Sequence, residues 1–224
     1  MILIGIPTHN GLFINEAVKA MLQTHYNGSV GLPAPVLFRT QQSSLLTRGF
    51  NQMWCDALNL RKEGCTHFLL WHADIEPEPH FLRKMWDIMT KNKADILSCV
   101  VPIKNPSLNG HTSTAYDEPT GVRRLTFSEL PQGTFEHELL LVNSGLMLIS
   151  LKKDWVEKVC FRFEDWLEKD ENGFFRANGI SEDWLFSRDA RKLGARIFAT
   201  REINLIHYGS FGYPNFGWDN AQSS

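Results

Sequence analysis

The sequence is poor in cysteine and has no excess of charge of either sign. Four cysteines occur in 224 residues, none in a Cys-x-x-Cys spacing, and most lie in apolar stretches, as reduced core thiols do: Cys55, Cys65, Cys99 and Cys160. Lys and Arg total 23 against 25 Asp and Glu, without a long run of one sign. The global basic surface that a nucleic-acid partner usually requires is therefore missing, although a local groove stays open.

Long hydrophobic runs are missing as well. The first residues have no basic leader and form too short an apolar run for a signal peptide or a membrane span. We therefore expect a cytoplasmic protein without a membrane span, in which the sequon Asn27-Gly28-Ser29 is a turn. Glycine-rich phosphate loops of the two common patterns do not occur, which argues against P-loop and dinucleotide-binding enzymes.

Short apolar runs alternate with longer amphipathic ones over the first half of the chain. This alternation predicts strand-helix-strand units and hence an α/β fold, in one compact domain over residues 1–224. Strands are expected at residues 3–7, 36–40, 66–71 and 95–101, and helices at residues 15–25, 45–63 and 79–91.

A polar segment at residues 102–134 interrupts this pattern. It is rich in Pro, Gly, Asn, Ser and Thr, and only residues 122–127 resemble a strand, so we expect a long loop that serves as a lid or binding segment. Regular structure resumes over 135–207, with strands at 138–142, 146–150, 196–199 and 204–207 and helices at 152–159 and 182–192. The aromatic, glycine-rich tail at 208–224 either covers a site or caps the core.

An apolar strand is expected to end at His72-Ala73-Asp74. Ligands bind beyond the carboxyl ends of the strands in open α/β sheets, so these side chains are expected where a ligand lies. Residues two apart on an extended chain point the same way, which lets His72 and Asp74 share a target. A carboxylate with an imidazole suits Mn²⁺ or Mg²⁺ bridging a diphosphate. Acids also favour a helix start, and alone the segment favours that plainer interpretation.

A second acidic pair, Glu182-Asp183, begins the helix expected at 182–192. Ser181 before the acids and Gly194 after a basic turn are ordinary start and stop signals of a helix. Capping therefore explains both acids by itself, and a catalytic interpretation depends on the motifs that accompany them.

Taken in order, these motifs resemble the GT-A fold of family-two-type inverting glycosyltransferases. The resemblance rests on Ile6-Pro7-Thr8-His9-Asn10, the Asp-x-Asp-like His72-Ala73-Asp74, Ser144-Gly145-Leu146-Met147 and Glu182-Asp183. It spans residues 2–207, and the segment around 106–133 has no counterpart in it. It implies a GT-A-like nucleotide-diphospho-sugar transferase fold with a central, mostly parallel mixed sheet flanked by helices. It also implies a nucleotide-sugar-binding half at 1–101 and an acceptor and catalytic half at 135–207.

The resemblance further implies roles for single residues. Those that would contact the donor are Pro7, Thr8, Asn10, Arg48, His72, Ala73 and Asp74. Those that would hold the metal are Asp74, His207 and His72, the last of which replaces the first Asp of the family motif and is still able to ligate a metal or contact ribose. Asp183 would be the catalytic base, with Glu182 positioning the acceptor or the base, and the acceptor side would include Ser144, Gly145 and Trp184.

The sequence thus predicts a metal-dependent inverting glycosyltransferase that uses a nucleoside-diphosphate sugar, expected to be a UDP-sugar, with Mn²⁺ or Mg²⁺. A nucleotidyltransferase of related α/β fold is one alternative, weakened because Thr8-His9-Asn10-Gly11 lacks the glycine-rich basic loop of that class. A non-catalytic nucleotide- or carbohydrate-binding module, in which the acids only cap helices, is another. The acceptor (a glycan, a protein or a modified nucleobase), the oligomeric state and the source, a bacterium or a virus-infected host, stay open.

Overall fold

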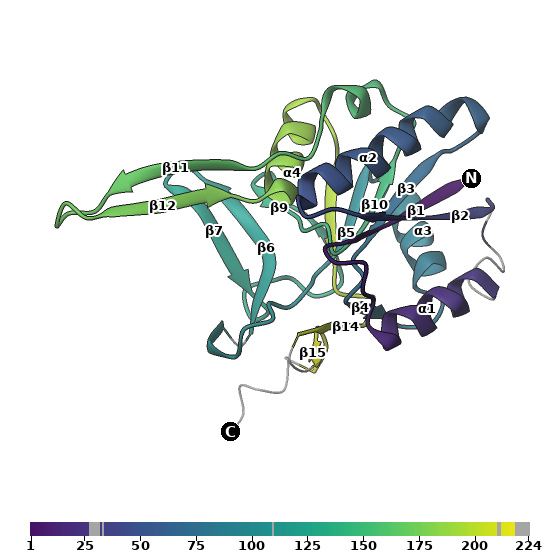
Figure 1. The fold of residues 1–224 in the computed structure, drawn as a ribbon, viewed down its shortest axis with the longest axis horizontal. Helices are drawn as coiled ribbons and strands as arrows, with labels where there is room; N and C mark the ends of the chain where they lie inside the picture. The colour runs from purple at the N-terminus through teal and green to yellow at the C-terminus, as the bar shows by residue number, and fades with distance from the viewer. Residues whose placement is uncertain (27–31, 33, 109, 210–211, 218–224) are drawn as a thin grey trace.

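A seven-stranded mixed sheet forms the centre of the molecule, in the order β2-β1-β3-β10-β5-β13-β8 (Figure 1). The computed structural model describes residues 1–224 except 27–31, 33, 109, 210–211 and 218–224. Its strands are β1 (Ile2–Thr8), β2 (Val36–Gln42), β3 (His67–Trp71), β5 (Ile96–Cys99), β8 (Thr134–Glu136), β10 (Leu146–Ser150) and β13 (Ile197–Thr200). Only β8 and β10 run antiparallel to their neighbours. The predicted α/β class with a mixed sheet is confirmed.

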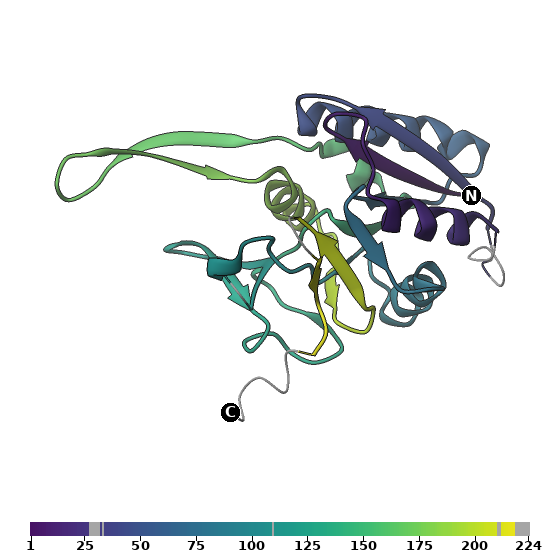
Figure 2. The same cartoon turned by 60° about the horizontal axis from the view of Figure 1, so that its bottom comes forward.

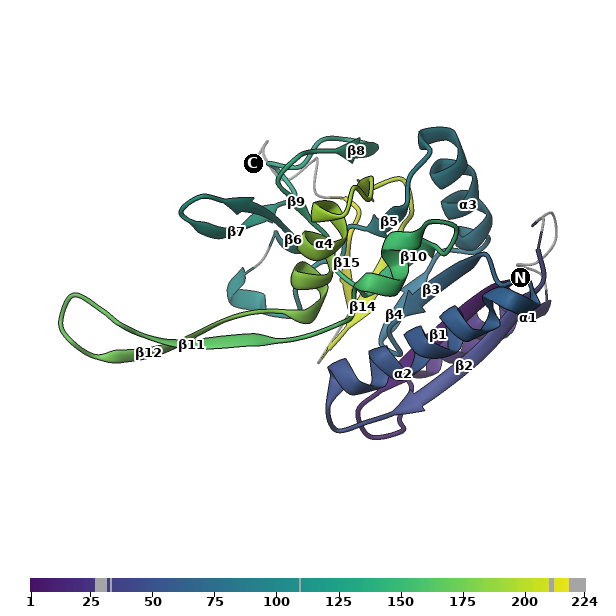
Figure 3. The ribbon, with the colours of Figure 1, turned by 90° about the horizontal axis from the view of Figure 1, so that it is seen from above.

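Helices cover both faces of this sheet (Figures 1 and 3). One face packs against α2 (Leu46–Asn59) and α4 (Glu182–Lys192), and the other against α1 (Asn15–Tyr26) and α3 (Phe81–Asn92). Alternate residues of β3 serve the two cores: Phe68 and Leu70 join the first, Leu69 and Trp71 the second. Since both faces are buried, β3 is a continuous apolar run that ends where the polar residues begin.

Two predicted helices differ from expectation. The helix expected at 45–63 divides into α2 and a 3-10 turn, η1 (Leu60–Glu63), which ends at Gly64 with a left-handed φ of 88°. The helix expected at 152–159 is only a 3-10 turn, η3 (Asp154–Lys158). A third 3-10 turn is η2 (Pro106–Leu108). None of the described helices is long and apolar enough to cross a membrane.

The expectation of a long loop over 102–134 is wrong for much of that segment. Strand β6 (His111–Glu118) forms an antiparallel hairpin with β7 (Gly121–Thr126) and also pairs with β9 (Leu140–Leu141). Thr112 and Thr114 are fully buried in β6, and the Thr112 hydroxyl donates to the Leu125 carbonyl (2.9 Å). Polar side chains buried in the hairpin, with the Thr112 hydroxyl satisfied there, gave this strand the composition of a loop.

A second hairpin projects from the body like an arm (Figure 2). It consists of β11 (Glu164–Lys169) and β12 (Phe175–Ile180), and every residue of β11 is exposed. We call residues 164–180 the arm. Its strands pair only with each other, and the sequence pattern did not predict it.

A small sheet joins β15 (Gly212–Pro214), β14 (Leu205–Tyr208) and β4 (Ile75–Pro77) below the main one. After β15, the buried Asn215 side chain donates to the carbonyls of Val100 (3.1 Å) and Ile203 (2.9 Å), so this part of the tail caps the core. The turn expected at 27–29, residues 210–211 and the end of the tail from 218 lie outside the described residues.

Candidate functional site

The candidate site begins in the turn that follows β3. The Ile75 amide donates to the His72 carbonyl (3.1 Å), so this segment is a turn rather than the extended chain assumed from the sequence. The strand after the turn, β4, pairs with β14 in a register that sets His207 opposite Ile75. The Tyr208 amide also donates to the Asp74 carbonyl (2.8 Å). This pairing brings His207 next to Asp74, two residues far apart in the chain.

The Asp74 carboxylate and the His207 imidazole face each other. His207 Nε2 lies 3.6 Å from Asp74 Oδ1, beyond hydrogen-bond distance, and Oδ1 is a buried oxygen without a hydrogen-bond partner in the described part of the chain. His207 Nδ1 donates to the Pro102 carbonyl (2.8 Å), which in a neutral ring leaves the lone pair on Nε2. A histidine held from behind by a carbonyl, beside an unsatisfied carboxylate oxygen, fits a divalent cation.

Lys104 lies on the other side of the Asp74 carboxylate, where its ammonium donates to Oδ2. Burial alone raises the pKa of Asp74, but His207, His72 and Lys104 outweigh burial and hold that pKa well below its ordinary range. Asp74 is therefore ionised at neutral pH. Sequence reasoning missed Lys104, because a single lysine in a polar segment carries no local signal of this contact.

The donor set defines the kind of cation site that is possible. Among the described residues, no group of three or more His, Cys, Asp and Glu side chains gathers around one point. Magnesium-like cations commonly bind one or two carboxylates and complete their shell with water and substrate phosphates. Asp74 and His207 therefore fit a cation shared with a diphosphate better than one enclosed by protein.

His72 lies beside this pair and is engaged elsewhere. Its Nε2 is 3.2 Å from Ser144 Oγ, and its ring centre is 5.5 Å from that of Phe50. Burial lowers the pKa of His72 to about 4 against the opposing effect of Asp74, so the ring is neutral at pH 7. With Nε2 engaged by Ser144, the neutral ring has only Nδ1 left for a ligand or a cation.

The second acidic pair lies in the first turn of α4, whose predicted bounds are confirmed. Three donors converge on Asp183: the Ser181 hydroxyl, the Trp184 amide (2.8 Å) and the Ser144 amide (3.3 Å). Burial nevertheless raises the pKa of Asp183, and burial with the Asp183 charge raises the pKa of Glu182 to about 7. Two adjacent carboxylates whose pKa values are both raised are suited to accept a proton.

Ser144 connects the two acidic sites. Its amide donates to Asp183, and its hydroxyl lies against His72. The His72 amide donates to the Gly145 carbonyl (2.8 Å), and a Cβ at Gly145 would lie 2.7 Å from Ile75 Cδ1, so a larger residue would require the Ile75 side chain to shift. His72, Ser144 and Asp183 thus form one continuous polar chain from the turn after β3 to the start of α4.

The residues expected to contact a donor are only partly exposed. Pro7 and Thr8 are buried at the end of β1, whereas Asn10 is exposed in the loop that follows. This loop lies against the turn after β3, because the Ile14 amide donates to the Ala73 carbonyl (3.3 Å). These backbone contacts join the ends of the two strands at one edge of the sheet.

Arg48 lies on α2, which follows β2. With residues from the ends of β1 and β2 it lines a surface hollow of about 550 Å³, together with His9, Gln41, Gln42, Ser43, Ser44, Leu45 and Gln52. This hollow is mostly polar, and its sides come from the carboxyl ends of two parallel strands. Position and polarity therefore both suit a nucleotide.

On the expected acceptor side, Ser144 and Gly145 are buried and Trp184 is half-buried. The indole Nε1 of Trp184 donates to the Ser113 carbonyl (2.9 Å), and the Arg124 guanidinium lies 5.0 Å from the centre of its ring. The β6–β7 hairpin thereby supplies groups to the site that the sequence did not assign.

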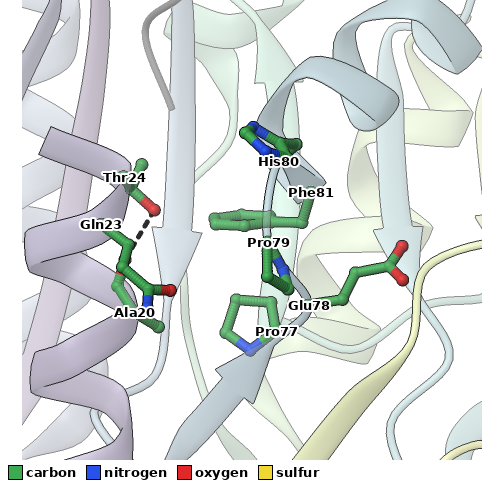
Figure 4. A pocket seen from close by; sticks show the side chains of 8 residues that line it. All are labelled: Ala20, Gln23, Thr24, Pro77, Glu78, Pro79, His80 and Phe81. Atoms are coloured by element: carbon green, nitrogen blue, oxygen red, sulfur yellow. Dashed lines mark hydrogen bonds between the residues drawn. The ribbon is translucent and has the colours of Figure 1, made fainter. Parts of the chain in front are cut away.

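A separate cavity of about 220 Å³ lies between α1 and the β4–α3 connection (Figure 4). Ala20, Gln23 and Thr24 form one wall, and Pro77, Pro79 and Phe81 stand opposite them (Figure 4). None of the residues predicted to bind donor, metal or acceptor lines it.

Neither a protein-family model nor a curated protein matches the sequence. Among solved structures, the chain is similar to a crystal structure assigned as a UDP-N-acetylglucosamine pyrophosphorylase from Entamoeba histolytica, with 13% sequence identity and a TM-score of 0.39. The match covers 89% of this chain and 58% of that chain, so the present chain corresponds to little more than half of its length. A similarity this weak supports no conclusion about activity, and the chemistry has to be inferred from the residues of the site.

Proposed function

We propose that the chain is a metal-dependent inverting glycosyltransferase of GT-A-like fold that transfers a sugar from a nucleoside-diphosphate sugar to an acceptor hydroxyl. The observation that carries this proposal is the polar chain of His72, Ser144 and Asp183. It joins a cation-compatible pair, Asp74 and His207, to a carboxylate suited to take a proton. Metal-dependent inverting transfer uses a cation at the leaving diphosphate and a base on the opposite face of the sugar.

Each residue has a defined part in this reaction. Asp183 takes the proton of the acceptor hydroxyl as the new bond forms at the anomeric carbon and the bond to the diphosphate breaks. Glu182 would position the acceptor or the base, and its own pKa is raised to about 7 by burial and by the neighbouring Asp183 charge. Asp74 and His207 would hold Mn²⁺ or Mg²⁺, which when bound neutralises charge on the departing diphosphate. Lys104 adds a fixed positive charge at the same carboxylate.

In this proposal the nucleotide-sugar donor binds at the edge of the sheet formed by the ends of β1, β2 and β3. The hollow lined by Arg48 and His9 offers hydrogen-bonding groups for a nucleotide, and His72 and Ala73 lie between this edge and Asp74. UDP is the nucleotide that the family resemblance favours, and residues 135–207 would bind the acceptor.

The direct test is incubation of the purified chain with UDP-, GDP- and TDP-sugars in the presence of Mn²⁺ or Mg²⁺. We expect release of the nucleoside diphosphate from at least one donor, and removal of the metal with EDTA should stop it. Boiled protein and metal without protein are the controls. No metal-dependent release from any donor would sink the proposal, and formation of a nucleotide sugar from a nucleoside triphosphate and a sugar phosphate would favour a nucleotidyltransferase instead.

The acid pair predicts how the rate depends on pH. Burial raises the pKa values of both acids, that of Glu182 to about 7, so the pair is protonated at acidic pH and the rate should rise with pH along an acidic limb. In Glu182→Gln the neighbouring negative charge is gone, and the limb should move to lower pH. Initial rates between pH 5 and 9 measure this shift. Glu63→Gln, which changes an exposed glutamate, is the control, and an unmoved limb in Glu182→Gln would separate Glu182 from the base.

A further inference from the structure

The β6–β7 hairpin is fastened to the first turns of α4, next to the acid pair. Trp184, directly after Asp183, donates from its indole to the Ser113 carbonyl on β6 (2.9 Å). One turn further along, Arg188 makes two hydrogen bonds to the carboxylate of Asp117, at 2.8 and 2.5 Å. The hairpin and the base are therefore held in a fixed relation to each other.

This anchoring places Arg124 of β7 beside the proposed base. Its guanidinium lies over the Trp184 ring at 5.0 Å from the centre. Burial lowers the pKa of Arg124, and the charge of Asp183 acts on it in the opposite direction. Arg124 makes no ion pair within the described chain. Its neighbour Arg123 differs, because it is paired with both Glu118 and Glu129. The two adjacent arginines thus differ: Arg123 is paired with carboxylates, whereas the N–H edge of Arg124 is available to a ligand.

We propose that Arg124, supported by Trp184, is a binding subsite for an anionic group of the acceptor, a carboxylate or a phosphate carried near the attacking hydroxyl. This inference rests on the proposed function and deepens it by naming the chemical class of the acceptor. A guanidinium stacked on an aromatic ring keeps its N–H edge free and pre-oriented for two parallel hydrogen bonds to such a group. Its positive charge also offsets the repulsion that an anionic acceptor meets from Asp183 and Glu182.

The charge of the acid pair explains why this subsite is needed for an anionic acceptor. Asp183 must be ionised to act as a base, and an acceptor that brings a second negative charge to the same place is repelled. A neutral acceptor meets no such barrier and gains little from Arg124. The subsite therefore determines which acceptor is preferred. It should change the affinity for the acceptor more than the rate of reaction once the acceptor is bound.

Binding measurements test the subsite without requiring turnover. Isothermal titration calorimetry would compare methyl β-D-glucuronide with methyl β-D-glucoside, and glucose 6-phosphate with glucose. We expect the tighter-binding anionic probe to have at least about tenfold higher affinity than its neutral counterpart, which is the effect of a hydrogen bond to a charged group. Whether that probe is the glucuronide or the phosphate shows which anion the subsite prefers. Equal affinity within both pairs, or no binding of any probe, overturns the proposal.

Arginine variants assign the effect to one residue. Arg124→Gln should remove the preference for the anionic probe, whereas Arg124→Lys keeps the charge but not the planar fork and should retain only part of it. Arg123→Gln is the matched control, since it removes an adjacent arginine that is already paired, and should keep the preference. Loss of the preference in Arg123→Gln, or its survival in Arg124→Gln, contradicts the assignment.

Kinetics separate this proposal from the proposed function. With an active donor, Arg124→Gln should raise KM for the anionic acceptor about tenfold and leave kcat nearly unchanged. A fall in kcat for charged and neutral acceptors alike would show that Arg124 only positions Asp183, which overturns the subsite. If no donor is turned over but anion binding still depends on Arg124, the subsite stands and glycosyl transfer does not.

Discussion

Asp183→Asn should lower metal-dependent transfer of the sugar to an acceptor, measured as release of nucleoside diphosphate, by about 10²–10⁴-fold, the usual contribution of a general base. The amide cannot take a proton, yet it has nearly the shape of the carboxylate. Its single oxygen can keep one of the two backbone donors, since the Ser144 amide donates to Oδ2 and the Trp184 amide to Oδ1. Donor binding in the presence of metal should therefore stay close to that of the unmodified protein. Initial rates and calorimetry with the donor and Mn²⁺ measure the two effects separately.

The matched control for this substitution is Asp189→Asn on the same helix. Asp189 pairs with Arg162, and within the described chain Asp189 has no contact with the acid pair. Arg162 would keep a second partner, Glu164, after the substitution. Its replacement should leave the rate unchanged. Turnover in Asp183→Asn equal to that of the control protein would remove Asp183 from the role of base and leave Glu182 as the next candidate.

Asp74→Ala should abolish metal-dependent donor binding and reduce the rate on the order of 10²-fold or more, because a metal contributes several kcal/mol to charge stabilisation. The substitution removes the only carboxylate of the proposed cation pair and leaves His207 alone. It also leaves Lys104 without its partner, so some electrostatic attraction for a diphosphate persists without metal. The residual binding should therefore be insensitive to EDTA.

Calorimetry of the donor with and without Mn²⁺ measures this difference. Asp87→Ala is the control, since Asp87 forms only an exposed ion pair with Arg83 on the surface of α3. Normal manganese-dependent donor affinity in the Asp74→Ala protein would contradict the ligand assignment, whatever happens to the rate.

The parts of the fold that the sequence predicted are those with a repeated local pattern. β3 is buried on both faces, so its apolar run and its abrupt polar end were both visible. The bounds of α4 followed from a Ser-acid start and a basic end. β6 was missed because polar threonines are buried in it, and the hydrogen bond of the Thr112 hydroxyl within the hairpin leaves no trace in composition.

The same distinction applies to the residues of the candidate site: those in a local sequence pattern were predicted, and those brought in by distant contacts were not. Asp74 and Asp183 stand out because acids follow a strand end and begin a helix, whereas their partners come from distant segments. Lys104 and Arg124 reach the site through contacts with Asp74 and Trp184, which are far from them in the chain, and no short motif encodes such contacts. The turn at His72 likewise depends on a contact with Gly145 that the local sequence does not specify.

The position of the arm determines which changes in it the rest of the fold would tolerate. None of residues 163–180 belongs to either hydrophobic core, and β12 ends at Ile180, two residues before the acid pair. An isolated two-stranded ribbon is marginally stable, so its loss or extension costs about nothing in folding free energy while Ser181 still begins α4. We therefore expect changes in the length or sequence of the arm to leave the carboxylates beside its root in place.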